Sequence, residues 1–314
     1  MKQQKHWSRP VASVLACSLL LSPLCVSGLR LSTYAATSEA SVTSETGILA
    51  RKTTKEGETP SLYALSADSF PTVRFTRNGA YMYRTGALID GEVYVPLYLF
   101  VRNYTNATYT YTGGTVTVNG NGLTVTATVG QSYIIANGRV LYTGLSSKGI
   151  DGNLWVPLKA ITRAVGITYS ASSSTQINLK GQYAPILHAN KYYREDEVYW
   201  LSRIISAESK GEPLQGQIAV GCVVLNRVKS SAFPNTIYGV IFDKKYGVQF
   251  SPTSNGTIYQ TPYEISVLAA KICLEGYDMG NVLYFYRPAY PGATNWISQN
   301  RKYAFTILHH QFYY

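Results

Sequence analysis

The spacing of apolar residues changes along the chain and divides it into two regions. From about residue 70 to residue 181, apolar and polar residues alternate between turn signals, as in residues 109–120 (YTYTGGTVTVNG). This period of two predicts short strands. From residue 195 onwards, apolar residues recur every three or four positions, which predicts helices. We therefore expect an α+β chain with two domains, a small mixed β/α domain over 70–181 and a mainly α domain over 195–314.

The strand-rich region contains an internal repeat. Residues 89–97 (IDGEVYVPL) recur as residues 150–158 (IDGNLWVPL). Each copy holds an Asp-Gly turn, a short strand, a proline that ends strand pairing, and then an amphipathic segment. The repeat predicts helices over 97–103 and 158–165, packed together in one module.

The helical region divides into three predicted helices. The first begins near Glu195 and runs to Glu208, and Gly211 ends it. Pro213 opens the second helix, which continues to about residue 229 and is apolar on all sides. A helix that is apolar all round is buried, so we expect the second helix at the centre of the domain. The third helix is predicted over 262–275.

The first 69 residues are predicted to lie outside both domains. A basic start, an apolar run over 11–31 and the small residues at 33–36 are typical of an export signal, predicted over 1–35. Residues 36–69 are rich in Ser, Thr and Glu and predict a flexible tether. No later segment reaches the ~18 consecutive apolar residues of a membrane span. We therefore expect a secreted protein without stable membrane insertion once the signal is removed.

The charge and the cysteines narrow the classes of partner. A formal net charge of +11 favours an anionic polymer, such as a bacterial wall or cortex. The basic residues are scattered and form no nucleic-acid-binding signature, so nucleic acid is not expected. Cys222 and Cys273 lie in apolar helical patterns, either as buried small hydrophobes or as one disulfide. No histidine accompanies them, so we expect neither a metal site nor a cofactor.

Glu208 is the main candidate for chemistry. It lies at the end of an apolar-periodic helix, just before the Gly-Glu-Pro break at 211–213. A carboxyl group in that place is held rigidly and partly dehydrated, and burial raises its pKa, which suits a general acid near neutral pH. The alternative is a buried structural acid paired with Arg203 or Arg227.

Two stretches of the chain resemble known families. In the last third, the matching segments are residues 201–213 (LSRIISAESKGEP), 216–220 (GQIAV), 224–228 (VLNRV), 233–234 (FP), 249–252 (QFSP), 256–257 (GT), 283–286 (LYFY) and 310–313 (HQFY). Together they resemble the SleB family of cell wall hydrolases. Residues 70–181, with the repeated Val-Pro-Leu, resemble the copper amine oxidase N-terminal-like stalk domain. That stretch has no histidine, so it offers no copper ligands. The stalk is either a spacer or a wall-binding module.

The SleB resemblance implies a lysozyme-like domain that cleaves peptidoglycan between N-acetylmuramic acid and N-acetylglucosamine. It also implies that Glu208 is the catalytic acid of a lytic transglycosylase, with spore cortex as the usual substrate. Ordinary glycoside hydrolysis needs two carboxyls, about 5–5.5 Å or about 6.5–9.5 Å apart. A lytic transglycosylase needs one, because the C6 hydroxyl of the sugar displaces the leaving oxygen. Since candidate second carboxylates are few, a single acid/base is favoured.

Two other interpretations stay open at this point. One is a two-carboxylate muramidase, and the other is a wall-binding or spore-surface structural protein without catalysis. A regulatory protein partner is also left open by the sequence.

The remaining candidates are expected to bind substrate or to support Glu208. The resemblance places Gln249, Phe250 and Ser251 in a loop that lines the glycan groove. The other predicted substrate-binding residues are Glu212, Tyr284, Tyr286, Trp296 and His310. Each has a structural alternative, which is loop fixation for Glu212, core packing for the three aromatic residues and support of the cleft wall for His310. Asn226 and Arg227 either orient the Glu208 loop or cap the end of the second helix.

Overall fold

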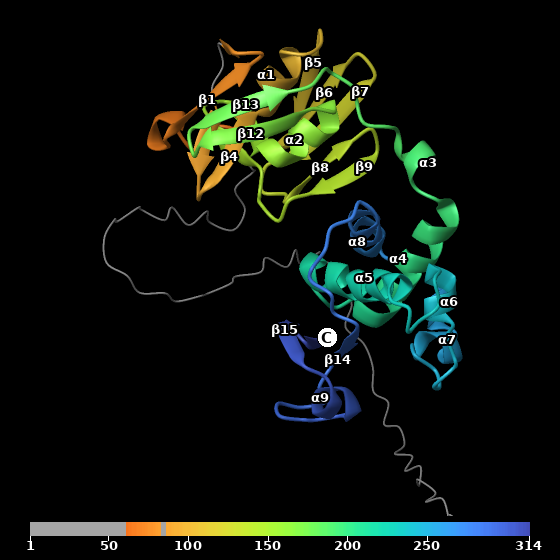
Figure 1. Ribbon diagram of the computed structural model, residues 1–314. Helices are drawn as coiled ribbons and strands as arrows, with labels where there is room; N and C mark the ends of the chain where they lie inside the picture. Colours follow the sequence, from red (N-terminus) through yellow and green to blue (C-terminus); the bar gives the residue numbers. More distant parts are fainter. Residues whose placement is uncertain (1–60, 83–85) are drawn as a thin grey trace, which may run out of the picture. The chain divides into compact units, whose positions relative to one another are not determined.

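The computed structural model describes residues 61–82 and 86–314 (Figure 1). The predicted export signal and the predicted tether up to residue 60 lie outside the described residues. The expected α+β class with two domains is confirmed, a strand-rich domain preceding a mainly helical one. In the described part of the chain, no helix combines the length and apolar character needed to span a membrane.

The first sheet of the strand-rich domain has the order β10-β11-β4-β3-β1-β13-β12, and β2 pairs with β1. Its pairs are antiparallel except β1 with β13, which run parallel. The strands are β1 (Thr72–Arg77), β2 (Ala80–Tyr81), β3 (Gly86–Ile89), β4 (Glu92–Pro96), β10 (Lys148–Ile150), β11 (Asn153–Pro157), β12 (Thr168–Ser173) and β13 (Gln176–Lys180).

A second sheet is a five-stranded antiparallel meander in chain order. It comprises β5 (Thr108–Thr112), β6 (Thr115–Gly120), β7 (Leu123–Thr128), β8 (Tyr133–Ala136) and β9 (Arg139–Tyr142). Alternate residues of β6 and β7 are buried, as the period of two predicts. Their buried faces meet the helices described next.

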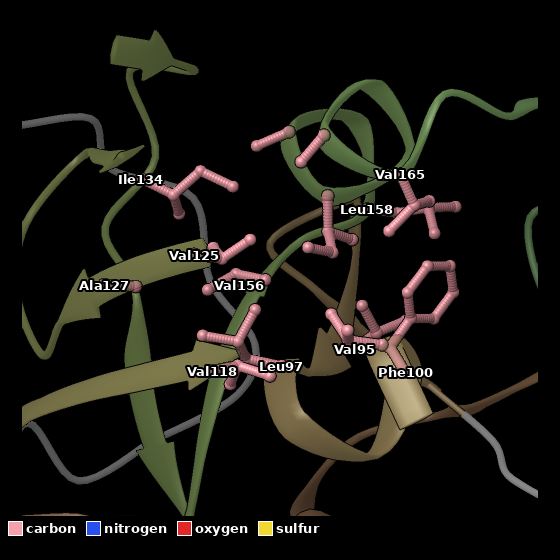
Figure 2. Close-up of a cluster of buried hydrophobic side chains, with 14 of the residues drawn as sticks. Val95, Leu97, Phe100, Val118, Val125, Ala127, Ile134, Val156, Leu158 and Val165 are labelled. Carbon is pink, nitrogen blue, oxygen red and sulfur yellow. The ribbon is translucent and has the colours of Figure 1, made fainter. Parts of the chain in front are cut away.

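The two copies of the sequence repeat become neighbours in the first sheet. Strand β4 leads into α1 (Leu97–Arg102), and β11 leads into α2 (Leu158–Val165). The two strands pair antiparallel, with Val95 opposite Val156. Asp90 and Asp151 both have positive φ, and each is followed by a glycine that also has positive φ, which is the geometry of a tight hairpin turn. Figure 2 shows the core that the two copies form with β6, β7 and β8.

The helical domain is built around α5 (Leu214–Lys229), which is buried along most of its length, as predicted. Helices α4 (Glu195–Ser209) and α8 (Glu264–Leu274) pack against it and against each other. The shorter helices are α3 (Ala189–Tyr192), α6 (Ile237–Ile241), α7 (Pro252–Asn255) and α9 (Trp296–Asn300), with a 3-10 turn η2 (Thr257–Tyr259).

A small antiparallel sheet completes the helical domain, and the sequence analysis did not predict it. Its order is β14-β16-β15, with β14 (Tyr284–Tyr286), β15 (Tyr303–Ile307) and β16 (His310–Tyr313). Phe312 at its centre is fully buried in the same core as α5. Strands of three to five residues, rich in tyrosine, show too little alternation to be recognised by period alone.

Residues 61–69, which the sequence assigned to the tether, contact the strand-rich domain. Leu62 is buried, and Leu65 forms a bridge with Ile150. The Ala67 N–H donates a hydrogen bond to the Asp151 carboxylate at 2.9 Å. The Asp-Gly turn of the second repeat copy therefore also binds the chain that enters the domain.

Cys222 and Cys273 are free and buried, so the disulfide alternative is wrong for this structure. The Cys222 thiol donates to the carbonyl of Tyr277 at 3.4 Å, and the Cys273 thiol donates to that of Ile218 at 3.3 Å. Both side chains pack as small hydrophobes between helices.

A buried carboxylate at the end of α8 joins the two domains. Glu275 accepts two hydrogen bonds from Arg139 of β9, at 2.8 and 2.7 Å. It also binds Arg163 of α2, and it accepts a hydrogen bond from Tyr193 at 2.6 Å. Glu275 and Arg139 are both less than a tenth exposed. Since a buried charge is stable only when it is paired and hydrogen-bonded, this network fixes α8 to the strand-rich domain.

Candidate active site

Glu208 lies in the last turn of α4, where the chain turns into α5. The turn is fixed by a hydrogen bond from the Ser209 hydroxyl to the Ile205 carbonyl at 2.6 Å, and by one from the Glu212 N–H to the Ser209 carbonyl at 2.9 Å. Pro213 then precedes the first residue of α5. The Glu208 side chain is therefore held by a packed helix and a closed turn, and it is half-buried.

Burial raises the pKa of Glu208 to about 7. The proposed structural pairing with Arg203 or Arg227 is absent, because no ion pair to Glu208 occurs within residues 61–82 and 86–314. Arg203 instead covers the ring of Tyr199, with its guanidinium carbon 3.6 Å from the ring centre. With a pKa near neutrality, the carboxyl can both give and take a proton at physiological pH.

Glu208 faces a cavity of about 1170 Å³ in the helical domain. The walls come from the end of α5, two loops after it, the small sheet and α9. The lining residues are Glu208, Arg227, Ser231, Ala232, Phe233, Lys245, Tyr246, Val248, Gln249, Phe250, Ser251, Tyr284, Phe285, Tyr286, Arg287, Trp296, Ile297, Arg301 and His310. A cavity of this size is above the usual range for small-molecule sites, about 300–1,000 Å³.

The cavity brings together all but two of the site residues predicted from sequence. The predicted residues on its wall are Glu208, Arg227, Gln249, Phe250, Ser251, Tyr284, Tyr286, Trp296 and His310. Glu212 and Asn226 lie outside the lining. Each of these two residues instead makes a contact inside the helical domain, as described next.

Asn226 and Arg227 hold the segment that leads into β14. The Asn226 amide donates to the carbonyls of Gly280 and Val282, at 2.8 and 3.1 Å. The Arg227 Nε–H donates to the carbonyl of Leu283 at 2.8 Å. Neither side chain caps α5, whose last carbonyls accept from the backbone N–H of Ser230. Both reach across to a chain segment more than fifty residues away, which the local sequence does not indicate.

Glu212 is buried beneath the cavity wall and binds two histidines. Its carboxylate lies 3.0 Å from Nδ1 of His309 and 3.3 Å from Nδ1 of His310. The first contact is a hydrogen bond, and the second is close enough for an ion pair but poorly aligned for a hydrogen bond. The backbone N–H that reaches Glu212 belongs to His309, at 3.4 Å. Glu212 therefore holds the turn between β15 and β16, whereas the sequence analysis expected it to fix its own loop.

His310 lines the cavity between Glu212 and an aromatic neighbour. Its ring meets Phe285 edge to face, with centroids 5.4 Å apart. Burial lowers its pKa, and the nearby Glu212 carboxylate opposes that effect. His310 is therefore mainly neutral at pH 7.

The sequence analysis did not predict the basic residues on the cavity wall other than Arg227. The guanidinium carbon of Arg301 lies 4.5 Å from the ring centre of Tyr284 and 5.0 Å from that of Trp296. Lys245 and Arg287 also line the cavity. The sequence signal that could have indicated Arg301 is its position, five residues after the predicted substrate-binding residue Trp296. The rings of Tyr284 and Trp296, which were predicted to bind substrate, are therefore also in contact with this guanidinium. Across the described chain, no cluster of His, Cys, Asp or Glu could hold a metal ion.

Comparison with family models identifies both domains. Residues 211–313 match the cell wall hydrolase model, and residues 76–178 match the copper amine oxidase N-terminal domain. Glu208 lies three residues before the start of the cell wall hydrolase match.

Curated proteins are similar to about a third of this chain. The spore cortex-lytic enzyme of Bacillus cereus is 40% identical over 97 residues, which cover 31% of this chain and 36% of that protein. The chain thus spans about a third of the length of such relatives. The cell wall hydrolase CwlJ of Oceanobacillus iheyensis is 30% identical over 114 residues, which cover 34% of this chain and 79% of that protein.

A solved structure of the same kind is also similar. It is the catalytic domain of a germination-specific lytic transglycosylase, SleB, from Bacillus anthracis. The identity is 36%, and the match covers 39% of this chain and 97% of the solved one, with a TM-score of 0.35.

Proposed function

We propose that this chain, which belongs to the cell wall hydrolase family, cleaves the glycan strands of peptidoglycan as a lytic transglycosylase. The observation that carries the proposal is the half-buried carboxyl of Glu208, with a pKa of about 7, on the wall of a large cavity. No other acidic residue lines that cavity in the described chain. A single acid/base is the arrangement that this reaction requires.

The reaction needs two proton transfers at one carboxyl group. Protonated Glu208 donates its proton to the glycosidic oxygen, and the bond from that oxygen to C1 of muramic acid breaks. The resulting carboxylate then takes the proton from the C6 hydroxyl of the same muramic acid. The C6 oxygen bonds to C1, a 1,6-anhydro ring closes, and Glu208 is protonated again. A pKa near 7 suits both transfers, because neither protonation state is strongly disfavoured.

The proposed substrate is spore cortex or vegetative wall, reached outside the cell. Relatives of the helical domain are named spore cortex-lytic enzymes, which favours cortex. The net charge of +11 favours an anionic polymer of this kind. Export by the predicted signal over 1–35 is part of the same proposal. The strand-rich domain serves as a spacer or as a further contact with the wall.

The test is product analysis with a matched pair of variants. Glu208→Gln keeps the shape of the side chain and loses the proton, so release of soluble products from cortex and sacculi should fall by about 10²–10⁴-fold. Glu264→Gln alters an exposed acid at the start of α8 and should leave the rate unchanged. Mass spectrometry should find anhydro ends. Reducing ends would indicate a muramidase, and an active Glu208→Gln variant would remove the basis of the proposal.

A further inference from the structure

The wall of the cavity carries an excess of positive charge. Glu208 is the single acidic residue of the lining, and it faces the basic side chains of Arg227, Lys245, Arg287 and Arg301. None of these four forms an ion pair with an acid inside the described ranges. Lytic chemistry at Glu208 needs no such charge, so the basic residues require a separate explanation.

Arg227 is the most informative of the four, because it is buried. Arg227 is 5% exposed, and its Nε–H donates a hydrogen bond to the Leu283 carbonyl. Its terminal nitrogen Nη1 is buried without a hydrogen-bond partner. Burial lowers its pKa to about 10, with weaker opposing effects from Tyr284 and Asp243. A buried unpaired guanidinium is costly, and an unsatisfied buried nitrogen calls for a partner. A bound substrate group can be that partner.

Arg301 lies on the rim of the same cavity, and its position is set by aromatic rings. It is exposed, but its guanidinium rests against Tyr284 and Trp296. The guanidinium carbon of Arg227 lies 5.5 Å from the centre of the same Tyr284 ring. Cation–π contacts hold an arginine in place while leaving its N–H groups free to donate. The buried and the exposed guanidinium therefore both lie against the ring of Tyr284.

We propose that Arg227 and Arg301 form a subsite for a carboxylate on the side chain of a muramic acid residue. The inference rests on the proposed function. Muramic acid carries a lactyl group, which ends either in a free carboxylate or in a peptide with its own carboxylates. The planar guanidinium fork is suited to carboxylate oxygens. The subsite orients the muramic acid whose bond is cut, and the separate position of Glu208 leaves its proton available.

The experiment compares three forms of the same glycan strands with wild-type enzyme. Native sacculi carry peptide carboxylates, amidase-treated strands carry the free lactyl carboxylate, and strands amidated with a carbodiimide carry neither. We expect cleavage of the amidated strands to be slower by about tenfold or more, because a charge-assisted contact is lost. A faster rate on amidase-treated than on native strands would identify the lactyl group as the source, and equal rates would show that either carboxylate fills the subsite. Loss of rate on amidase treatment would identify the peptide.

Variants decide whether the two arginines are responsible. Arg301→Gln removes an exposed charge without disturbing the core, and it should abolish the preference for native over amidated strands. Arg227→Lys keeps a charge but loses the fork, and it should reduce the same preference. Arg102→Gln is the matched control, since Arg102 is also exposed and rests over a tyrosine, Tyr98, in the strand-rich domain. It should keep the preference of the wild type.

The outcomes separate the subsite from the proposed function. Wild-type enzyme that cuts native and amidated strands at the same rate would overturn the subsite while the transglycosylase proposal stands. An Arg301→Gln variant that keeps the full preference would overturn it as well. Absence of cleavage of all three substrates by wild type would instead reject the proposed function.

Discussion

Glu208 combines two properties that rarely occur together, a dehydrated carboxyl and access to a large cavity. The helix period predicted its position, and the Gly-Glu-Pro break predicted the turn that holds it. The partners of Glu212 and Arg227 could not be predicted in the same way. They lie at 309–310 and at 283, and a side chain that reaches so far along the sequence leaves no local pattern. The sequence thus predicted which residues line the cavity better than it predicted their contacts.

The raised pKa of Glu208 predicts how activity and stability depend on pH. Burial destabilises the charged form, so the folded-state pKa lies above the unfolded one. The associated stability is present below the unfolded pKa and is lost as pH rises through about 7. Cleavage should also decline above pH 7, because the proton donor is consumed. Glu208→Gln should be more stable than wild type at pH 9, by about 1–3 kcal/mol.

Denaturant unfolding at pH 5 and pH 9, together with a pH–rate profile of anhydro product release, measures both effects. The control is Glu264→Gln, which replaces an exposed carboxyl. Its stability and its rate should match those of the wild type at each pH. A rate that keeps rising from pH 7 to pH 9 would contradict the role of Glu208 as the acid.

Among elements, the three packed helices depend on close approach at one glycine. A Cβ atom on Gly221 of α5 would lie 2.6 Å from the Cys273 sulfur of α8 and 2.8 Å from Ile205 of α4. The apolar run predicted that this helix is central, but not that it meets both neighbours at a residue without a side chain. The β14–β16 sheet was missed for a related reason, since its partners are set by packing and not by period.

Substitution of this glycine tests the packing directly. Gly221→Ala should lower the free energy of unfolding by about 1–3 kcal/mol, because helices α4 and α8 must move apart. This loss is the net value, after the ~1 kcal/mol that alanine gains in helix propensity. Gly211→Ala is the control, because its Cβ would meet nothing within 4 Å. Equal stability of the two variants in urea would show that α5 is less tightly held than the structure indicates.

For the whole molecule, the change of hydrophobic period predicted two domains in the right order. It did not predict their junction, because Arg139 and Glu275 are 136 positions apart and each occurs in an ordinary local sequence. A buried carboxylate with two arginines and a tyrosine is expensive to disturb. It makes the folding of the strand-rich domain and that of the helical domain depend on each other.

Neutralising this carboxylate should separate the two domains in unfolding experiments. Glu275→Gln leaves Arg139 buried without a counter-charge, so we expect a loss of about 3–5 kcal/mol. We also expect a broadened or two-step transition in place of one. Glu197→Gln removes an ion pair between a largely exposed Arg194 and a partly exposed Glu197, and it should cost less than about 1 kcal/mol. A single unshifted transition for Glu275→Gln would show that the junction contributes little.

We expect proteases to cut the helical domain between the small C-terminal sheet and α9. The segment between β14 and α9, including Tyr290, is largely exposed, whereas Phe312 beyond it is fully buried. A nick in this segment would loosen one wall of the cavity and admit water to Glu208. The pKa of the Glu208 carboxyl would then fall, and the group would lose its proton below neutral pH. We therefore expect a single cut in this exposed loop, far from Glu208 in sequence, to abolish the proposed cleavage activity.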